Sequence, residues 1–519
     1  MSVFSVAIRV DSGLAMGSGH LMRCLTLADE LQRRGALVQF ISRAHPGNML
    51  ARLEQRGYEV HRLAPPQGAV DRDASRRWLG VAAEQDARET LARLARGRVD
   101  LLIVDHYGID AIWERCLRSA AARLLVVDDV ADRPHEADFL LDQNYGRADI
   151  ERRYRERVPE RCRLLLGPRY ALLQPIYKEL RQVLPERTGA VRRVLVFFGA
   201  HDPSHSVLRV LQALAEPQFA QLAIDVVPGH GAEAAAAVRA VAQGRPNVAI
   251  HEDQPSLAGL MARADLAIGA GGTTTWERAC LGLPSLVATV AANQMELAAA
   301  LAADGCIELA GAASDLTAQD WSALLRGLLS QPERIAQLQR RTSGLADGSG
   351  AGRVARLLMD TRDATIKLRR ATRADEAMLL DWANDQTVRR QSFSTSQIAP
   401  ENHHRWLAAR LHDPDCMILI GEDPHGCPLG QVRFDVQRDR AEAMVNISVD
   451  RDARGRGAGG VLLKAAVGRW LAEEPQLQPI AEVLADNVAS QRLFLAAGFT
   501  PVAGRRPGAV AYAYRRSDR

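Results

Sequence analysis

The sequence predicts an α/β protein with two doubly wound, parallel-sheet halves followed by a smaller domain of mixed α/β structure. Three observations carry this prediction. A length of 519 residues corresponds to about three domains of ~150 residues each. Short aliphatic runs alternate with longer helical stretches as far as residue 345, and from Ile366 onward the runs resemble antiparallel strands. We therefore expect domains over residues 1–175, 176–360 and 366–519.

Apolar runs in the first two halves predict buried parallel strands, because both faces of each run are apolar. In the first half they are Val6–Ile8, Val38–Ile41, Leu101–Val104 and Leu124–Val127, and in the second half Val194–Phe198, Leu222–Val226, Leu266–Ile268 and Ser285–Val287. The seam is expected between Leu166 and Arg193, where Gly167-Pro168 and the stretch 185–189 interrupt the pattern.

A Gly/Ser-rich stretch, Ser343–Gly352, precedes the point at which the pattern changes from parallel-type to antiparallel-type strands. A short helix, Val354–Met359, and a charged link, Asp360–Thr365, are expected to lead into the third domain. Its predicted strands are Met417–Ile420, Gly430–Phe434 and Ala443–Ile447.

Charge and cysteine usage narrow the function classes. Sixty-six Lys and Arg against 62 Asp and Glu give a net charge of +4, too balanced for a nucleic-acid-binding protein. Seven scattered cysteines without a C-x-x-C pair indicate reduced thiols in the cytoplasm, and no zinc spacing predicts a metal site. No apolar run approaches 18 residues, and the apolar N-terminal stretch is too short for a signal peptide. We expect a soluble, cytoplasmic protein.

A glycine-flanked histidine follows the first predicted strand. After Asp11, the residues Gly17-Ser18-Gly19-His20 open a predicted helix. The glycines allow close backbone approach, and a helix N-terminus favours an anion such as phosphate. The same position disfavours imidazolium, so His20 could accept a proton as a neutral ring. From the spacing alone, a histidine that merely caps the helix is the simpler interpretation.

A second glycine loop, Gly269–Glu277 (GAGGTTTWE), joins a predicted strand to a helix and is followed by Gly282-Leu283-Pro284 and Asn293-Gln294. Backbone amides and threonine hydroxyls suit a diphosphate, and the carboxylate of Glu277 suits ribose hydroxyls. An anion trap without catalysis is the alternative. Because each of the two halves carries such a loop, we expect a ligand between them.

A third loop, Arg454–Gly460 (RGRGAGG), follows the apolar strand Ile447–Asp450 and precedes a helix. Successive bare N–H groups and two arginines suit a pyrophosphate. The pattern gains weight from Glu482 on a strand and from Asn487 and Phe494 downstream.

The strand–GAGGTTTWE–GLP–NQ arrangement resembles the nucleotide-sugar half of the GT-B architecture, which has two Rossmann-like halves. More narrowly, residues 3–345 resemble the UDP-2,4-diacetamido-2,4,6-trideoxy-β-L-altropyranose hydrolases of pseudaminic acid biosynthesis. The matching segments are Arg9–Asp11, Gly17–His20 with Arg23, Asp105–Ile109, Asp128-Asp129, Leu141–Asn144, Gly167–Leu173 and Phe198–Asp202. Ala200-His201 departs from the family, which more often has Gly-Thr or Gly-Ala-Ser before the aspartate.

This resemblance implies hydrolysis of a UDP-sugar, with His20 as the general base that activates water for inverting attack on the anomeric carbon. It implies that Glu277 holds the ribose and that Asn293 contacts sugar or phosphate. His106 would shape the sugar pocket, although a structural histidine is an equal alternative. The implied substrate-binding residues are Asp11, Gly17, Gly19, Arg23, His106, Tyr107, Arg169, Gly272, Thr273, Glu277 and Asn293.

Residues 366–515 resemble the GCN5-related N-acetyltransferase (GNAT) superfamily, in particular the acetyltransferase of the preceding pathway step. The resemblance implies acetyl-CoA as co-substrate and Glu482 as the base, acting through water. The implied cofactor-binding residues are Ile447, Val449, Arg454, Gly455, Arg456, Gly457, Gly459, Gly460, Asn487 and Phe494. Phe494 stands where many members carry a tyrosine that protonates the leaving thiolate, so a non-catalytic domain is an alternative.

The expected function is therefore bifunctional: N-acetylation of a 4-amino UDP-sugar, then hydrolysis of the product to free sugar and UDP. Partners are the UDP-sugar and acetyl-CoA, without metal, nucleic acid or membrane. Three alternatives stay open. They are a GT-B glycosyltransferase with a fused acetyltransferase, a UDP-sugar sensor with an inert acetyl-CoA-binding domain, and an acetyltransferase that modifies protein N-termini.

Overall fold

The computed structural model describes residues 3–66, 77–94, 97–146, 149–199, 202, 204–229, 232–252, 254–359 and 365–515, without the side chains of 232–234 and 293. The chain forms two compact units, Met1–Leu358 and Met359–Arg519. The first contains two parallel sheets and the second a mixed sheet. The predicted fold class, two Rossmann-like halves with parallel sheets followed by a mixed α/β domain, is confirmed.

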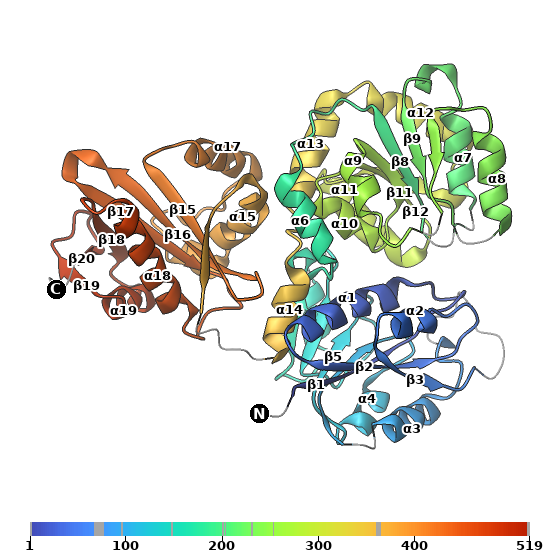
Figure 1. Ribbon diagram of the computed structural model, residues 1–519, viewed down its shortest axis with the longest axis horizontal. Helices are drawn as coiled ribbons and strands as arrows, with labels where there is room; N and C mark the ends of the chain where they lie inside the picture. Colours follow the sequence, from blue (N-terminus) through green and yellow to red (C-terminus); the bar gives the residue numbers. More distant parts are fainter. Residues whose placement is uncertain are drawn as a thin grey trace. The chain divides into compact units, whose positions relative to one another are not determined.

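The first sheet has the strand order β3-β2-β1-β4-β5-β6-β7, and neighbouring strands pair in parallel. Its strands are β1 (Ser5–Val10), β2 (Leu37–Arg43), β3 (Glu59–Leu63), β4 (Val99–Asp105), β5 (Ala121–Val127), β6 (Phe139–Asp142) and β7 (Arg163–Leu166). The helical segments that precede the second sheet are α1 (Gly19–Arg33), α2 (Leu50–Gln55), α3 (Ala83–Arg93), α4 (Ala111–Leu117), α5 (Ile150–Arg155), the 3₁₀ turn η2 (Pro168–Tyr170) and α6 (Pro175–Val183). Figure 1 shows α1 and α2 on one face of this sheet and α3 and α4 on the other.

The second sheet has the order β10-β9-β8-β11-β12-β13 and is also parallel. Its strands are β8 (Arg193–Phe197), β9 (Ala223–Val226), β10 (Val248–Ile250), β11 (Leu266–Ala270), β12 (Ser285–Thr289) and β13 (Glu308–Ala312). Its helical segments are α7 (Ser206–Ala213), η3 (Pro217–Phe219), α8 (Ala232–Ala242), α9 (Ala258–Arg263), α10 (Thr274–Cys280), η4 (Ala292–Gln294), α11 (Met295–Ala303), η5 (Ala313–Asp315), α12 (Ala318–Leu329), α13 (Pro332–Ser343) and α14 (Gly350–Met359).

Alternation along β8 explains how the second half buries both faces of its sheet. Val194 and Val196 belong to one core cluster, which also includes Trp321 of α12. Leu195 belongs to the other, together with Met261 of α9. Successive side chains of a strand point to opposite faces, so a run that is apolar throughout needs helices on both sides.

Helix α14 returns to the segment that follows the first sheet. Nη1 of Arg353 donates a hydrogen bond to the carbonyl oxygen of Arg169 at 3.0 Å. A Cβ added to Gly350 would lie 2.3 Å from the carbonyl oxygen of Ala171, so only glycine fits there. The predicted Gly/Ser-rich stretch therefore supplies the first turn of this helix, which begins before Val354. The predicted charged link falls largely on residues 360–364, outside the described residues.

Strand order places both glycine loops beside the point at which the winding direction of their sheet reverses. β1 lies between β2 and β4, and β8 lies between β9 and β11, so the winding direction reverses at these strands. Ligands of doubly wound sheets bind beyond the carboxyl ends of the strands at such points. The loops after β1, β4 and β11 carry Asp11–His20, His106-Tyr107 and Gly271–Thr273.

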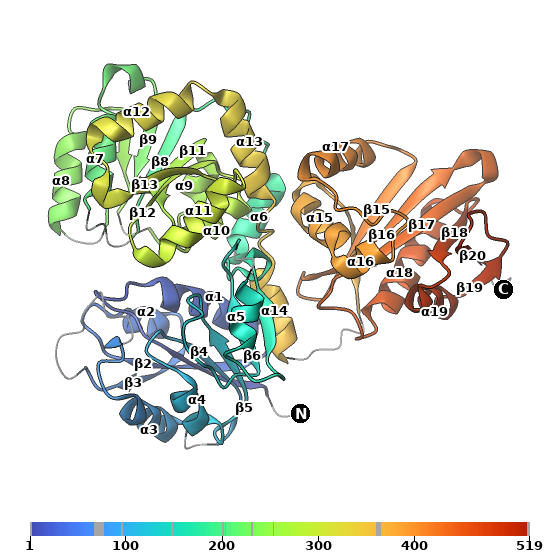
Figure 2. The ribbon, with the colours of Figure 1, turned by 180° about the vertical axis from the view of Figure 1, so that it is seen from behind.

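The second unit has the sheet order β14-β15-β16-β17-β18-β20-β19, antiparallel except where β17 and β18 pair in parallel. Its strands are β14 (Lys367–Arg370), β15 (Cys416–Glu422), β16 (Pro428–Gln437), β17 (Glu442–Val449), β18 (Gln478–Leu484), β19 (Phe499–Val502) and β20 (Ala509–Tyr514). Its helical segments are η6 (Arg373–Asp375), α15 (Glu376–Asn384), α16 (Gln386–Arg390), α17 (Pro400–Leu411), η7 (Arg438–Arg440), α18 (Ala458–Glu473) and α19 (Val488–Ala496), most of them visible in Figure 2.

Candidate functional sites

The loop between β1 and α1 is folded tightly before the helix begins. Gly13 and Gly17 exchange backbone hydrogen bonds of 3.2 and 2.8 Å, and Gly17 has a φ of +76°, which favours glycine. Helix α1 then begins at Gly19, and the side chain of its N-cap residue, Ser18, caps none of its N–H groups. His20 lies in the first turn of α1, and its side chain is the candidate general base.

Asp105, the last residue of β4, orients His20. Its Oδ1 lies 2.6 Å from Nδ1 of His20, and Arg23 binds the same carboxylate through Nε at 2.6 Å and Nη2 at 2.7 Å. Burial opposes ionisation of Asp105, but Arg23 and His20 hold its pKa well below the ordinary value. A carboxylate accepts the Nδ1–H of a neutral imidazole and leaves Nε2 as the basic nitrogen.

Two aromatic rings contact His20, and a second carboxylate, that of Asp129, binds its neighbour Arg23. Its ring meets Tyr107 edge-on at 4.7 Å and Trp78 at 6.2 Å between centroids. The Tyr107 hydroxyl donates to Asp129 at 2.6 Å, and Arg23 reaches the same Asp129 at 3.0 Å. The His20 side chain keeps 11% of its surface exposed, and its Nε2 makes no hydrogen bond to any described residue. The ring is thus fixed at one nitrogen and open at its other edge.

Asp11 and His106 lie beneath the site. Asp11 is buried against the guanidinium of Arg9, at 2.5 Å, and accepts the backbone N–H of Arg43 at 2.7 Å. His106 accepts the N–H of Gly108 at Nδ1, 2.9 Å away, and its Nε2 lies 3.4 Å from Asp11. Burial lowers the pKa of His106 to about 3 and keeps it neutral. Both side chains are almost completely buried and support the loop from the interior.

The second glycine loop meets the first. A Cβ added to Gly19 would lie 3.3 Å from Oγ1 of Thr273, so these two loops approach within van der Waals contact. Helix α10 begins at Thr274, and, as in α1, the N-cap side chain, here that of Thr273, caps no N–H group. Gly272 lies beside Gln294, whose Nε2 would be 3.7 Å from an added Cβ. Two uncapped helix starts are therefore gathered in one region, an arrangement that attracts anions.

Glu277 lies in the first turn of α10, and its carboxyl group hydrogen-bonds the side chain of Tyr177 from α6. Burial raises the pKa of its carboxyl group to about 7. Arg169, in the 3₁₀ turn η2, places its guanidinium 5.1 Å above the ring of Tyr170. The side chain of Asn293 and the departure at Ala200-His201 lie outside the described residues.

A cavity of about 1080 Å³ in the second unit gathers most of the predicted cofactor-binding residues. It is lined, among others, by Ile447, Val449, Arg454, Gly455, Gly457, Gly459, Gly460, Asn487, Phe494 and the predicted base Glu482. Arg456 is not among the lining residues. Gly455 and Gly457 have φ values of +73° and +86°, so the loop before α18 requires glycine at both positions.

Separation of β17 from β18 opens this cavity between the strands. Residues Glu442–Met444 of β17 pair with Gln478–Ile480 of β18. Beyond these residues the two strands no longer pair, and each lines one side of the cavity. Glu482 of β18 is nearly buried and forms an ion pair with the exposed Arg506 at 3.1 Å. Arg454 holds the loop through the Val449 carbonyl at 3.0 Å, so its guanidinium has a structural partner.

Phe494 and Asn487 also have structural contacts. Phe494 is buried, meets Phe499 edge-on at 5.0 Å, and stacks on Tyr512 with centroids 6.3 Å apart. It borders the cavity and offers no proton. The side chain of Asn487 caps α19 by accepting the N–H of Ser490 at 3.1 Å.

Sequence reasoning missed two groups of residues. The first is the orienting network around His20, in particular Asp105 and Asp129; a carboxylate at the end of a central strand was the signal that could have identified Asp105. The second is the cavity wall from α15–α17, β15 and β16, for which no motif is visible. Its side chains include Trp382, Arg389, Asn402, His403, Trp406 and Arg433.

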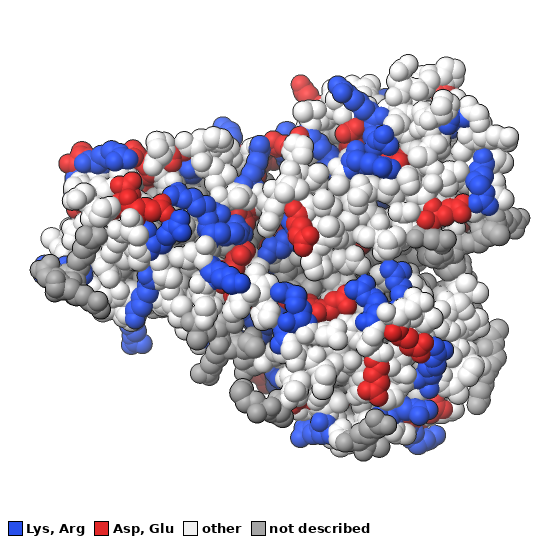
Figure 3. Space-filling view, in the orientation of Figure 1, with Lys and Arg blue, Asp and Glu red and all other residues white. Residues whose placement is uncertain are grey.

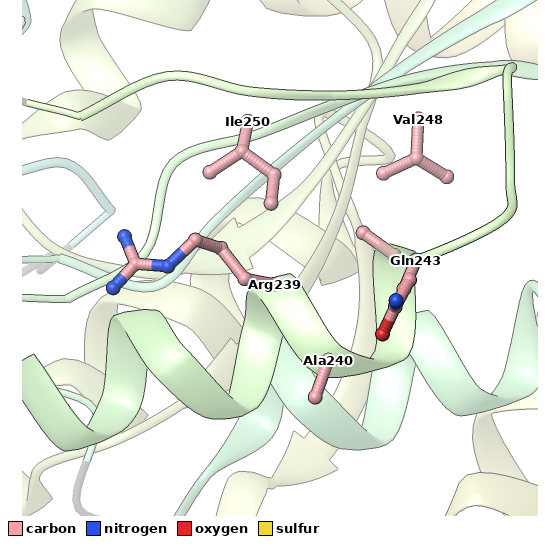
Figure 4. A pocket seen from close by; sticks show the side chains of 6 residues that line it. Arg239, Ala240, Gln243, Val248 and Ile250 are labelled. Atoms are coloured by element: carbon pink, nitrogen blue, oxygen red, sulfur yellow. The ribbon is translucent and has the colours of Figure 1, made fainter.

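A shallower depression in the first unit has fewer polar lining residues than the large cavity. This depression, of about 500 Å³, lies between α8 and the edge strand β10. Figure 4 shows Arg239, Ala240 and Gln243 of this region on the helix side, facing Val248 and Ile250 of the strand. Arg239 is already paired with Glu252. On the face shown in Figure 3, basic and acidic side chains are interspersed.

The described residues contain neither a candidate metal site nor a membrane-spanning helix. Within them, no group of three or more His, Cys, Asp or Glu side chains could hold a metal ion. Within the same residues, no helix has the length and apolar character needed to cross a membrane.

Both units of the chain have counterparts among known proteins. Residues 365–500 match the Acetyltransferase (GNAT) domain family model. The chain is 26% identical over 366 residues to the spore coat polysaccharide biosynthesis protein SpsG of Bacillus subtilis (strain 168), an alignment that covers 70% of this chain and 99% of that protein.

Two further relatives extend the comparison. The uncharacterized protein MJ1062 of Methanocaldococcus jannaschii is 22% identical over 515 residues, covering 95% of this chain and 96% of its own length, so the alignment runs through both units. The UDP-2,4-diacetamido-2,4,6-trideoxy-beta-L-altropyranose hydrolase of Campylobacter jejuni is 24% identical over 220 residues, with 42% of this chain and 68% of that protein covered. The chain is thus similar to a polysaccharide biosynthesis protein and to a UDP-sugar hydrolase, and its residues 365–500 match the GNAT acetyltransferase family model.

Proposed function

We propose that the chain performs two consecutive steps on one UDP-sugar. The second unit transfers an acetyl group from acetyl-CoA to the 4-amino group of UDP-4-amino-4,6-dideoxy-β-L-AltNAc. The first unit then hydrolyses the product, UDP-2,4-diacetamido-2,4,6-trideoxy-β-L-altropyranose, to the free sugar and UDP. The similarity to a hydrolase of that name and the GNAT match support this pairing. All seven cysteines are free, and we place the protein in the cytoplasm.

The observation that carries the hydrolytic step is the bond of 2.6 Å between His20 and the buried carboxylate of Asp105. With Nδ1–H donated to Asp105, Nε2 takes a proton from water as the oxygen attacks the anomeric carbon. The bond from that carbon to the β-phosphate oxygen breaks, and its electron pair leaves with UDP. Attack from the opposite face inverts the anomeric configuration.

Departure of UDP requires stabilisation of negative charge. The uncapped N-termini of α1 and α10 lie within contact of one another and supply N–H groups and positive helix ends. Electrostatic stabilisation of this kind lets a nucleoside diphosphate leave without a general acid. Thr273 is proposed to bind the diphosphate and Glu277 the ribose.

The acetylation step uses the large cavity of the second unit. We assign acetyl-CoA to the Arg454–Gly460 loop, which lines the cavity together with the separated strands. The neutral amine attacks the thioester carbonyl, Glu482 takes the amine proton through water, and the thiolate of CoA leaves. The thiol has a pKa near ~8.5, so it can leave without a donor at the position of Phe494. On the opposite wall the charged residues are Arg389 and Arg433, which suit an acceptor that carries a diphosphate.

The test is NMR of the full chain with the 4-amino UDP-sugar and acetyl-CoA in one tube. We expect a new N-acetyl signal, then loss of the UDP-linked anomeric signal and appearance of the inverted free sugar. Release of UDP without any acceptor also separates hydrolysis from a glycosyltransferase, which shares the fold. Binding of both ligands without turnover would contradict the proposal and favour a sensor. Spermidine and a peptide with a free N-terminus, added as competitors, test the acceptor class.

A further inference from the structure

The large cavity of the second unit has two sides, and only one of them is assigned above. Loop Arg454–Gly460, the separated strands and α19 form the acetyl-CoA side. The other side is built by α15, α16, α17, β15 and β16, and nothing in its sequence resembles a motif. His403 of α17 lies on this side.

The hydrogen-bonding capacity of His403 is unused within the protein. Its side chain is buried, with 3% of the residue exposed, and Nδ1 is sealed from solvent without a hydrogen-bond partner among the described residues. Its Nε2 makes no hydrogen bond to a described residue either. An unpartnered buried nitrogen destabilises a fold, because the group loses water and gains nothing in return. Nδ1 is sealed and out of a ligand's reach, whereas Nε2 is not among the sealed nitrogens, so Nε2 is the atom that a ligand in the cavity can contact.

The neighbouring His404 shows what a structural histidine looks like on the same helix. Its Nδ1 lies 3.0 Å from the carboxylate of Glu376, and the residue does not line the cavity. His403 has no comparable ion pair. Burial lowers the pKa of His403 to about 4, so the ring is neutral at pH 7 and serves as a hydrogen-bonding group rather than a cation.

Packing holds the His403 ring in place. Trp406, one turn along α17, lies 5.3 Å from it at an interplanar angle of 40°. The guanidinium of Arg433, from β16, lies 5.2 Å from the ring centroid of Trp406. All three residues line the cavity. This row of flat groups fixes the imidazole without using either nitrogen, which is a preorganised arrangement for binding.

We propose that the His403 imidazole hydrogen-bonds the acetyl acceptor and so acts as a specificity-determining residue of the acceptor side of the cavity. The proposal rests on the acetyltransferase function assigned above. The ligand group is a hydroxyl or amide of the amino sugar, since a neutral ring can donate to or accept from either one.

The test compares His403→Leu and His403→Gln with the matched variants His404→Leu and His404→Gln, all in the full chain. Initial rates of CoA release are measured while the 4-amino UDP-sugar concentration is varied at saturating acetyl-CoA. They are then measured while the acetyl-CoA concentration is varied at saturating UDP-sugar. We expect His403→Leu to raise the acceptor KM at least tenfold and to leave the acetyl-CoA KM unchanged. His403→Gln should recover much of the loss, because its amide restores a hydrogen bond, and the His404 variants should keep the wild-type KM. An unchanged acceptor KM in His403→Leu overturns the proposal.

A second measurement needs no acceptor. Thermal unfolding of His403→Leu should give a Tm equal to or above that of the wild type, because the variant removes an unpartnered buried nitrogen. A Tm lower by several degrees would show a structural role and overturn the proposal. If the wild type fails to acetylate the UDP-sugar, the proposed substrate is wrong. The same variants are then compared with spermidine and with glucosamine as acceptors, and the Tm comparison decides if neither is acetylated.

Discussion

The two candidate bases of this chain, His20 and Glu482, are held in opposite ways. His20 is oriented by a carboxylate that is itself buried and bound by Arg23, which also reaches Asp129. Among the described residues, Glu482 forms one ion pair, with an arginine whose side chain is 61% exposed. Surface ion pairs contribute little, about 0–1 kcal/mol, whereas buried networks are costly to break. The first site is therefore preset by the fold, and the second depends on what enters its cavity.

The largest effect is expected from His20→Ala. UDP release should fall by about 10²–10⁴, because the general base is lost. UDP affinity, measured by calorimetry, should stay close to that of the wild type, since the anion is bound by helix N-termini. Wild-type turnover by this variant would remove His20 from the mechanism.

Loss of the second base should affect only the other reaction. In Glu482→Gln we expect acetyl transfer to fall by about 10². Hydrolysis of UDP-sugar that is already acetylated should be unaffected, and CoA release and UDP release assayed separately make the comparison. A parallel loss of both activities would mean that the two units do not act independently.

Asp105→Asn tests the orienting network directly. The amide no longer favours the Nδ1–H tautomer, so we expect UDP release to fall by about 10–10². Because Arg23 loses part of a buried pair, the free energy of unfolding should fall by up to about 3–5 kcal/mol, measured by denaturant titration. Tyr107→Phe is the control, since it removes only one hydrogen bond to Asp129 and should cost about 1 kcal/mol. Equal effects of the two variants on UDP release would contradict a special role of Asp105.

Phe494→Tyr should have the smallest effect. A hydroxyl at this position could protonate the leaving thiolate, and we expect acetyl transfer to rise by a few fold at most, because CoA is already a tolerable leaving group. Steady-state rates of CoA release measure this. A large loss would instead show that the packing of Phe494 on Tyr512 cannot accept the added oxygen.

Sequence reasoning found most of the inner strands of both sheets and missed the edge strands. The central strands β1, β4, β8 and β11 are apolar on both faces and stand out as runs. The edge strands β3, β7, β10 and β13 were not predicted, because each is short and partly exposed; β13 is only half-buried along its length. The inner strand β6 was not predicted either, and it has only four residues.

The same contrast holds for the sites. Glycine loops are visible in sequence, since a positive φ such as that of Gly455 or Gly457 requires glycine. The Asp105 contact was not predicted, because residues 20 and 105 meet only through the placement of β4 beside β1. His403 was passed over for a similar reason: helix α17 carries no motif, and only the folded unit shows that one of its two adjacent histidines borders the cavity.

Hydrolysis in H₂¹⁸O tests the central claim, attack of base-activated water on the anomeric carbon, most directly. The account predicts that mass spectrometry finds one ¹⁸O in the released sugar and none in UDP, with rates that collapse in His20→Ala. Label in the β-phosphate of UDP would show cleavage of the phosphorus–oxygen bond and contradict the mechanism.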